Sequence, residues 1–384
     1  MHLLVLLAAL LLHGGCANAL NNGLGITPQM GWNSWNHFNC GIDEALIRKT
    51  ADLLVSTGLS QVGYKYLNLD DCWEAPARDS AGNLQFNSTS FPSGGAALGD
   101  YIHSKGLKFG IYSSAGDKTC QSRPASLNHE VADANQFARW GVDYLKLDNC
   151  FSENIDPKIR YPKMRDALNA TGRQIFYSLC EWGKEDPATW AGAVGNSWRT
   201  TGDIDDSYAR MISNVNNNNA WAKYAGVGMW NDPDMLEVGN GGMTTDEYKT
   251  HFSLWCLIKS PLIVGCDISN MSPDTVSILT NAEAIAVNQD PLGVQGQRVF
   301  PTNATADQEV WAGPLSNGDN AVVLVNKGLA PANVTVTWAM MGLPMTTTVN
   351  IRDLWAHKGL GPFTGSYTAT LASHAVTFLP LSAP

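Results

Sequence analysis

The chain has 384 residues, of which 44% are hydrophobic and 16% charged, and it contains 13 Trp and 11 Tyr. This composition permits a large buried core and excludes an intrinsically disordered chain. The formal net charge of −10 excludes nucleic acid and anionic membrane surfaces as favourable partners, because their phosphates would be repelled.

The N-terminus, MHLLVLLAALLLHGGCANAL, combines an apolar run from Leu3 to Leu12 with the small-residue sequence ANA that ends at Ala19. The run is too short to span a bilayer, so we expect residues 1–19 to be a cleaved secretory signal peptide. A buried N-terminal helix is the alternative. Five sequons fit entry into the secretory pathway, leading to the cell exterior or wall, or to a vacuole or lysosome. They are Asn87, Asn169, Asn270, Asn303 and Asn333.

Strand-like and helix-like segments then alternate up to about residue 300. The segment DEALIRKTADLLVSTG is a predicted helix with Asp43 as its cap and Gly58 at its end. Its apolar face is predicted to be Ile47, Ala51, Leu54 and Val55. Eight such strand–helix units fit a (β/α)8 barrel over residues 20–300. A doubly wound open sheet is the alternative, but no GxGxxG follows the first strand. The run Asn216–Asn219 is expected to be a polar loop after a helix.

The residue pattern changes from alternating helix-like and strand-like segments to strand-like segments alone after NQDPLG, Asn288–Gly293. The segments AVVLVN, NVTVTW, TTTVNI, SYTATL and AVTFLPL are short, β-branched and alternating, and the dipeptide Asn317-Gly318 is typical of a hairpin turn. We therefore predict a separate antiparallel β domain over residues 301–384. Nothing in it suggests catalysis, since its strands do not end in clusters of polar residues.

Polar side chains gather where the barrel strands end, which is the edge where active sites of this fold lie. They are Trp35, Asp70, Asp71, Tyr112, Lys146, Asp148, Glu181, Arg199, Asp203, Asp232 and Asp234. Aromatic faces stack on sugar rings and carboxylates accept from hydroxyls, so this mixture predicts a carbohydrate site. Metal binding by the carboxylates is the competing interpretation, which the charges of Lys146 and Arg199 disfavour. We expect no metal and no cofactor.

Two of these carboxylates have surroundings that suggest the different protonation states needed for glycoside hydrolysis. Lys146 and Asp148 project to the same face of one strand, so the ammonium group should lower the pKa of Asp148 and keep it ionised as a nucleophile. Asp203 lies near Asp205 and Asp206, whose charges should raise the pKa of a general acid. From spacing alone, Asp148 could instead cap a loop, and Asp205 could be the acid.

Eight cysteines become seven if Cys16 leaves with the signal peptide, so at least one thiol has no partner within the chain. Four lie at or after apparent strand ends, where disulfides could join loops: Cys40, Cys72, Cys120 and Cys150. The other three lie in apolar surroundings and are predicted to be buried free thiols: Cys180, Cys256 and Cys266.

The strand-end motifs, in chain order, are GWNSWNHF, NLDDCW, GIYSSAG, YLKLDNC, CEWG, WRTTGDI, WNDPDML and NQDPLG. Together they resemble glycoside hydrolase family 27, specifically its eukaryotic α-galactosidases (melibiases), from about Gly23 to the C-terminus. The resemblance implies a TIM barrel followed by an antiparallel β-sandwich domain. It also implies a retaining double displacement that needs no cofactor.

The resemblance further implies residue roles. Asp148 would be the nucleophile and Asp203, rather than Asp205, the acid/base. Substrate-binding roles would fall on Trp35, Asp70, Asp71, Tyr112, Lys146, Glu181, Arg199, Asp234 and Met235. Cys40 would pair with Cys72, and Cys120 with Cys150. Within this family the residue after the fifth-strand cysteine, here Glu181, would accept from the galactose 2-hydroxyl and leave no room for an N-acetyl group.

We therefore expect an exo-acting enzyme that removes terminal α-linked galactose from galacto-oligosaccharides, galactomannans or galactolipids. One alternative is a relative that acts on α-N-acetylgalactosaminides or β-L-arabinopyranosides. Another is a non-catalytic sugar-binding protein on the same fold. We expect no membrane span, and the sequence favours neither a monomer nor a homodimer.

Overall fold

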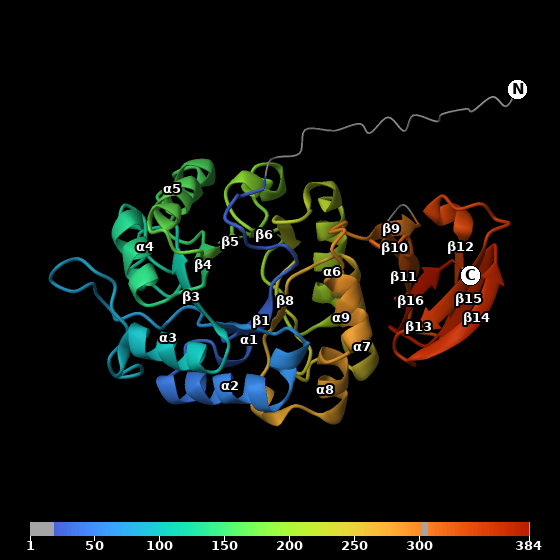
Figure 1. The fold of residues 1–384 in the computed structure, drawn as a ribbon, viewed down its shortest axis with the longest axis horizontal. Coiled ribbons are helices and arrows are strands. Elements are labelled where there is room, and N and C mark those ends of the chain that lie inside the picture. Colours follow the sequence, from blue (N-terminus) through green and yellow to red (C-terminus); the bar gives the residue numbers. More distant parts are fainter. Residues whose placement is uncertain (1–18, 302–305, 384) are drawn as a thin grey trace, which may run out of the picture.

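The computed structural model describes residues 19–301 and 306–383 (Figure 1). Three sequence predictions lie outside these ranges: residues 1–18 of the signal peptide, the Cys16 thiol and the Asn303 sequon. Among the described residues, none of the helices is long and apolar enough to cross a membrane.

Eight parallel strands form one sheet in which each strand from β1 to β7 pairs with its neighbour along the chain, and β8 pairs with β1. After β7, Leu236 forms an isolated parallel bridge with Val264 of β8, and this bridge closes the sheet. The closed order confirms the predicted barrel and excludes the open sheet. The strands are β1 Met30–Asn33, β2 Tyr66–Asn68, β3 Lys108–Ser114, β4 Tyr144–Asp148, β5 Phe176–Cys180, β6 Ser197–Arg199, β7 Trp230–Asp232 and β8 Leu262–Val264.

Helices cover the outside of the strands (Figure 1). They are α1 Trp35–Phe38, α2 Glu44–Ser56, α3 Gly94–Ser104, α4 Glu130–Arg139, α5 Pro157–Ala170, α6 Tyr208–Asn219, α7 Thr245–Leu257, α8 Pro273–Leu279 and α9 Ala282–Asn288. The predicted cap of α2 is confirmed, since the Asp43 side chain accepts from the Leu46 backbone N–H. Val55, however, is 37% exposed, because it lies about 100° around the helix from the buried Leu54.

The expected loop at Asn216–Asn219 is the last turn of α6. Tertiary contacts hold these residues in the helix despite the low helix propensity of asparagine. The Asn218 Oδ1 accepts from the Thr200 hydroxyl at 2.7 Å, and the Asn219 Oδ1 accepts from the Arg298 backbone N–H at 3.0 Å. The loop prediction was therefore wrong, because the partners of these amides lie far away in the sequence.

The remainder of the described chain forms an antiparallel sandwich. Its strands are β9 Gln297–Phe300, β10 Gln308–Pro314, β11 Asn320–Asn326, β12 Ala332–Thr337, β13 Thr348–Asp353, β14 Lys358–Thr364, β15 Ser366–Leu371 and β16 Val376–Ser382. Six of them form one sheet, and β12 pairs with β15 in a second. Asn317-Gly318 lies in the hairpin between β10 and β11, as predicted. Because β9 already pairs with β10, the antiparallel sheet begins before residue 301.

Strand β11 is buried on both faces, and its alternating side chains explain how the two layers join. Val322 and Leu324 belong to the core between the two antiparallel sheets. Val323 and Val325 point the other way and belong to the core of the barrel. Helix α7 packs against this second face, and its residues from Thr250 to Leu257 are all buried (Figure 1). The β layer therefore covers one helix of the barrel.

An ion pair also joins the two layers. Arg352 of β13 donates to both carboxylate oxygens of Glu283 in α9, at 2.5 and 2.9 Å, and the His357 Nδ1 lies 2.7 Å from the same carboxylate. The hydrogen bonds from Arg352, and then those from His357, lower the pKa of Glu283 from 4.5 to about 2. The pair is partly exposed, so solvent weakens it.

Replacing Glu283 with glutamine is expected to lower the free energy of unfolding at pH 7 by at most about 1 kcal/mol. A depressed folded-state pKa stabilises the protein above the unfolded pKa near 4.5, and this stabilisation is lost as the pH falls through about 2. Urea unfolding of the unchanged protein and the variant from pH 2 to pH 7 would therefore show a difference in the free energy of unfolding that disappears at the acid end. A difference of equal size at both ends would contradict the ion pair's contribution.

Candidate active site

A cavity of about 310 Å³ opens at the carboxyl ends of the barrel strands. Every predicted catalytic and substrate-binding residue except Glu181 lines it. These residues are Trp35, Asp70, Asp71, Tyr112, Lys146, Asp148, Arg199, Asp203, Asp234 and Met235. A second, smaller cavity of about 20 Å³ is lined by Lys146, Arg199, Asp234 and Met235 as well, and by Asp232. The strand-end residues chosen from the sequence are thus brought together in one place.

Asp148, the last residue of β4, is fixed by its neighbours and is only 6% exposed. One carboxylate oxygen accepts from the Tyr112 hydroxyl at 2.9 Å, and the other accepts from the Asn149 backbone N–H at 2.8 Å. Burial raises the pKa of Asp148, and the positive charge of Lys146 only partly offsets this effect. The expected net lowering of this pKa was wrong, because the cost of burying the charge outweighs the attraction of the ammonium group.

The direct partner of Lys146 is Asp70, at the end of β2. The Lys146 Nζ lies 2.7 Å from the Asp70 Oδ2, which also accepts from the Asn33 Nδ2 at 2.8 Å. The side chain of Lys146 is 15% exposed and points into the cavity. The Asp70 carboxylate therefore connects β1, through Asn33, with β4, through Lys146, and the ammonium group gives the pocket a fixed positive charge beside Asp148.

Arg199, at the end of β6, supplies the second positive charge. Its guanidinium lies 3.1 Å from Asp203 and 3.0 Å from Asp234, and it donates to the Cys180 sulfur at 3.7 Å. Burial raises the pKa of Asp203, but the charges of Arg199 and Lys146 outweigh it and the net pKa is lowered. The expected increase was wrong, because Arg199 contacts Asp203 directly. The Asp203 side chain is 75% exposed, which places it at the mouth of the pocket.

Asp234 has a left-handed backbone with φ of +90°, which is costly for a residue other than glycine. Its side chain pairs with Arg199 and accepts from the Ile204 backbone N–H at 2.8 Å. Its own backbone N–H donates to Asp232, whose pKa burial raises to about 6. These contacts hold the strained residue in place, so that the Asp234 carboxylate meets the segment after β6.

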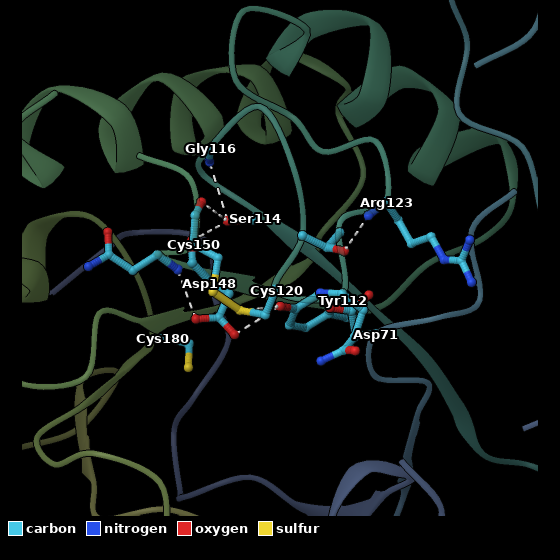
Figure 2. The surroundings of a disulfide bond; sticks show 12 residues. Asp71, Tyr112, Ser114, Gly116, Cys120, Arg123, Asp148, Cys150 and Cys180 are labelled. Atoms are coloured by element: carbon cyan, nitrogen blue, oxygen red, sulfur yellow. Dashed lines mark hydrogen bonds between the residues drawn. A yellow bond between two sulfur atoms is a disulfide. The ribbon is translucent and has the colours of Figure 1, made fainter. Parts of the chain in front are cut away.

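A disulfide between Cys120 and Cys150 lies directly beside Asp148 (Figure 2). The Tyr112 hydroxyl reaches both the Cys120 sulfur, at 3.3 Å, and the Asp148 carboxylate. Because the two sulfurs near Asp148 are bonded to each other, they offer no thiolate to a metal ion. The bond ties the loop after β3 to the loop after β4, and so limits the movement of Asp148.

The second implied disulfide, Cys40–Cys72, is also present. It joins the segment after α1 to the residue that follows Asp71. The three remaining described cysteines are free and buried, as predicted: Cys180, Cys256 and Cys266.

Arg160 is a buried support of the Asp148 loop that the sequence did not reveal. From α5 it donates to the Asn149 Oδ1 at 2.5 Å, to the Ala115 carbonyl at 3.0 Å and to the Ile155 carbonyl at 2.7 Å. The first two partners follow β4 and β3, respectively. A residue within a helix carries no strand-end signal, so pattern analysis could not have selected it.

Glu181 does not line either cavity. It is fully buried and accepts from the Glu185 backbone N–H, and burial raises its pKa to about 7. Ser178 and Cys180 line the smaller cavity, so the alternation of β5 turns Glu181 away from it. The structure therefore gives no support to the expected contact with a 2-hydroxyl, and it brings Cys180 to the cavity instead.

Several cavity-lining residues were missed: Asn36, Asn39, Ile204, Glu237 and Asn240. Asn36, Glu237 and Asn240 lie just beyond strand ends that had been identified. Extending the search by a few residues past β1 and β7 would have found them. Asp205 and Asp206 were considered only as neighbours or substitutes of Asp203.

A cavity dominated by carboxylates at this end of a (β/α)8 barrel is typical of barrel glycoside hydrolases. Comparison with known protein families supports the same class. A family described as "Alpha galactosidase A" matches residues 27–290, and one described as "Alpha galactosidase C-terminal beta sandwich domain" matches residues 305–381. The chain belongs to the α-galactosidase (melibiase) family.

Similar proteins cover nearly the whole chain. An α-galactosidase of Coffea arabica is 61% identical over 92% of this chain and 93% of its own length. The crystal structure of α-galactosidase I from Mortierella vinacea matches with a TM-score of 0.92 and 41% identity, over 94% of this chain and 98% of that one. A structure of the Saccharomyces cerevisiae enzyme with raffinose matches with a TM-score of 0.89 and 34% identity, over 96% of this chain and 100% of that one.

Proposed function

We propose that this chain is a retaining exo-α-galactosidase that hydrolyses terminal, non-reducing α-D-galactosyl residues. The observation that carries the proposal is that Asp148 and Asp203, from different strand ends, line one cavity together with Lys146 and Arg199. Asp148 would attack the anomeric carbon, and Asp203 would protonate the departing oxygen and then activate water. Galacto-oligosaccharides, galactomannans and galactolipids are the candidate substrates.

Substrate binding would prepare the two aspartates for these roles. Asp203 is exposed in the free protein, so a bound galactoside that displaces water would raise its pKa and favour the protonated acid. Asp148 is already buried, and positive charge developing on the sugar would favour its ionised form. Lys146 and Arg199 would hold Asp70 and Asp234 as acceptors for sugar hydroxyls.

Retention of configuration is the expected stereochemical result. With p-nitrophenyl α-D-galactoside, proton NMR at early times should show α-galactose first, with the β-anomer appearing later by mutarotation. Two inversions at the anomeric carbon give this order. If β-galactose appeared first, the covalent mechanism and the nucleophile role of Asp148 would both be rejected.

The alternatives are distinguished by substrate. Rates with the nitrophenyl derivatives of α-N-acetylgalactosamine and of β-L-arabinopyranose should be far below the rate with the α-galactoside. Galactose binding without hydrolysis of any of the three would instead support a non-catalytic sugar-binding protein.

The same proposal covers targeting and domain organisation. Residues 1–19 would be a signal peptide, residues 20–300 the catalytic barrel and residues 301–384 the β domain, to whose sheet Gln297–Phe300 already belong. The two disulfides support passage through an oxidising secretory compartment, towards the cell exterior or a vacuole or lysosome. N-terminal sequencing of the secreted protein should begin at Leu20.

A further inference from the structure

One wall of the cavity has no role in the proposed mechanism. Asn36 lies in the short helix α1 after β1, and Asn39 follows that helix. Glu237 and Asn240 lie in the segment between β7 and α7. All four side chains line the cavity, and they carry amides and a carboxylate rather than apolar groups.

Glu237 is the centre of this wall. It is only 2% exposed, and its two carboxylate oxygens accept from the Asn36 Nδ2 and, at 2.6 Å, from the Asn240 Nδ2. Its backbone N–H donates to the His251 Nε2 at 3.0 Å, which fixes the segment behind it. Because both amide nitrogens are directed at Glu237, the orientation of each amide is set, and each Oδ1 points away from the carboxylate. The Asn240 Oδ1 lies 3.1 Å from the Nδ1 of the exposed His37, so a leaving-group hydroxyl would share this acceptor with the imidazole.

The wall lies nearer the mouth of the cavity than the place where the glycosidic bond would be cleaved. The inner end of the cavity carries Lys146, Arg199 and Asp234, which it shares with the smaller cavity beneath. The exposed Asp203 marks the mouth, and the side chains of Asn36 and Asn240 are half-buried. An exo-acting enzyme holds the terminal sugar at the closed end, so the leaving group extends from Asp203 towards the mouth.

We propose that Asn36, Asn240 and Glu237 form a subsite for a leaving group that is itself a sugar. This inference rests on the proposed function and deepens it by naming the substrate class. The two amides exchange hydrogen bonds with leaving-group hydroxyls, and Glu237 is a positioning residue that fixes their orientation. The two amides lose bound water when a leaving group enters, so they need new hydrogen-bond partners. The hydroxyls of a sugar ring supply such partners, whereas an aryl or lipid group does not.

The test compares two substrates that share galactose and differ in the leaving group: melibiose, which leaves glucose, and p-nitrophenyl α-D-galactoside. Glu237→Gln keeps the shape of the side chain but turns an amide NH₂ towards an asparagine NH₂, so one of the two amides loses its orientation. We expect kcat/KM for melibiose to fall about tenfold, and that for the aryl substrate to change by less than about threefold. The ratio of specificity constants is the readout, because a general loss of folded protein leaves it unchanged.

Asn240→Ala provides a second variant, which keeps Glu237 but removes one of its two amide donors, and it should change the ratio in the same direction. Glu44→Gln, on the outer helix α2, is the control and should leave the ratio unchanged. Equal losses with both substrates in Glu237→Gln and in Asn240→Ala would overturn the subsite. If the unmodified protein hydrolysed neither substrate, the proposed function itself would fail.

Discussion

Replacement of Asp148 by asparagine is expected to lower kcat for every α-galactoside by about 10³-fold or more. An amide of the same shape has one acceptor oxygen where the carboxylate has two, so it keeps only one of the hydrogen bonds donated by Tyr112 and Asn149, and it cannot form the glycosyl ester. The comparison requires steady-state rates of both proteins and circular dichroism spectra to show that the fold is kept. Near-normal activity in a folded variant would remove Asp148 from the mechanism.

Chemical rescue separates loss of the nucleophile from general damage. In Asp148→Ala the missing carboxylate leaves space for azide, which should restore turnover and yield β-galactosyl azide by a single inversion. The opposite anomer, or no azide product at all, would contradict attack from the side on which Asp148 lies.

Replacement of Asp203 by alanine is expected to have the second largest effect, and the effect should depend on the leaving group. The value of kcat/KM for melibiose should fall by about 10²–10⁴-fold, since the departing sugar oxygen needs a proton. With 2,4-dinitrophenyl α-galactoside the fall should be much smaller, because dinitrophenolate leaves without protonation. Initial-rate measurements with both substrates give the two numbers directly.

Asp205→Asn is the matched control for this experiment, since Asp205 lines the same cavity two residues away. The change in kcat/KM caused by this substitution should be the same for melibiose and for 2,4-dinitrophenyl α-galactoside. If Asp205→Asn showed the dependence and Asp203→Ala did not, the acid/base role would belong to Asp205.

The strand-end residues could be predicted because β strands of a barrel end at one face, whatever their detailed packing. This rule placed Asp70, Asp148, Arg199 and Asp234 in one cavity before any coordinates were considered. It misplaced Glu181 only because the alternation along β5 was not applied. Ser178 and Cys180 share one face, so the next residue had to face the other way.

The electrostatics could not be predicted from spacing. The pKa of Asp148 depends on how deeply it is buried, and the pKa of Asp203 depends on a contact with Arg199. Neither quantity follows from proximity in the sequence. The same holds for Arg160, whose three partners lie in other segments, and for the asparagines at the end of α6.

Helix α7 connects the β-sandwich to the catalytic cavity. Its Trp255 Nε1 donates to the Asp234 carbonyl at 2.8 Å, directly behind the strained carboxylate that pairs with Arg199. The second half of this helix is buried on all sides, and part of what covers it is β11. The C-terminal layer thus supports, through α7, the backbone of a residue that lines the cavity. A truncated barrel ending near residue 296 would expose part of α7 to water and weaken the support behind the Asp234 carboxylate.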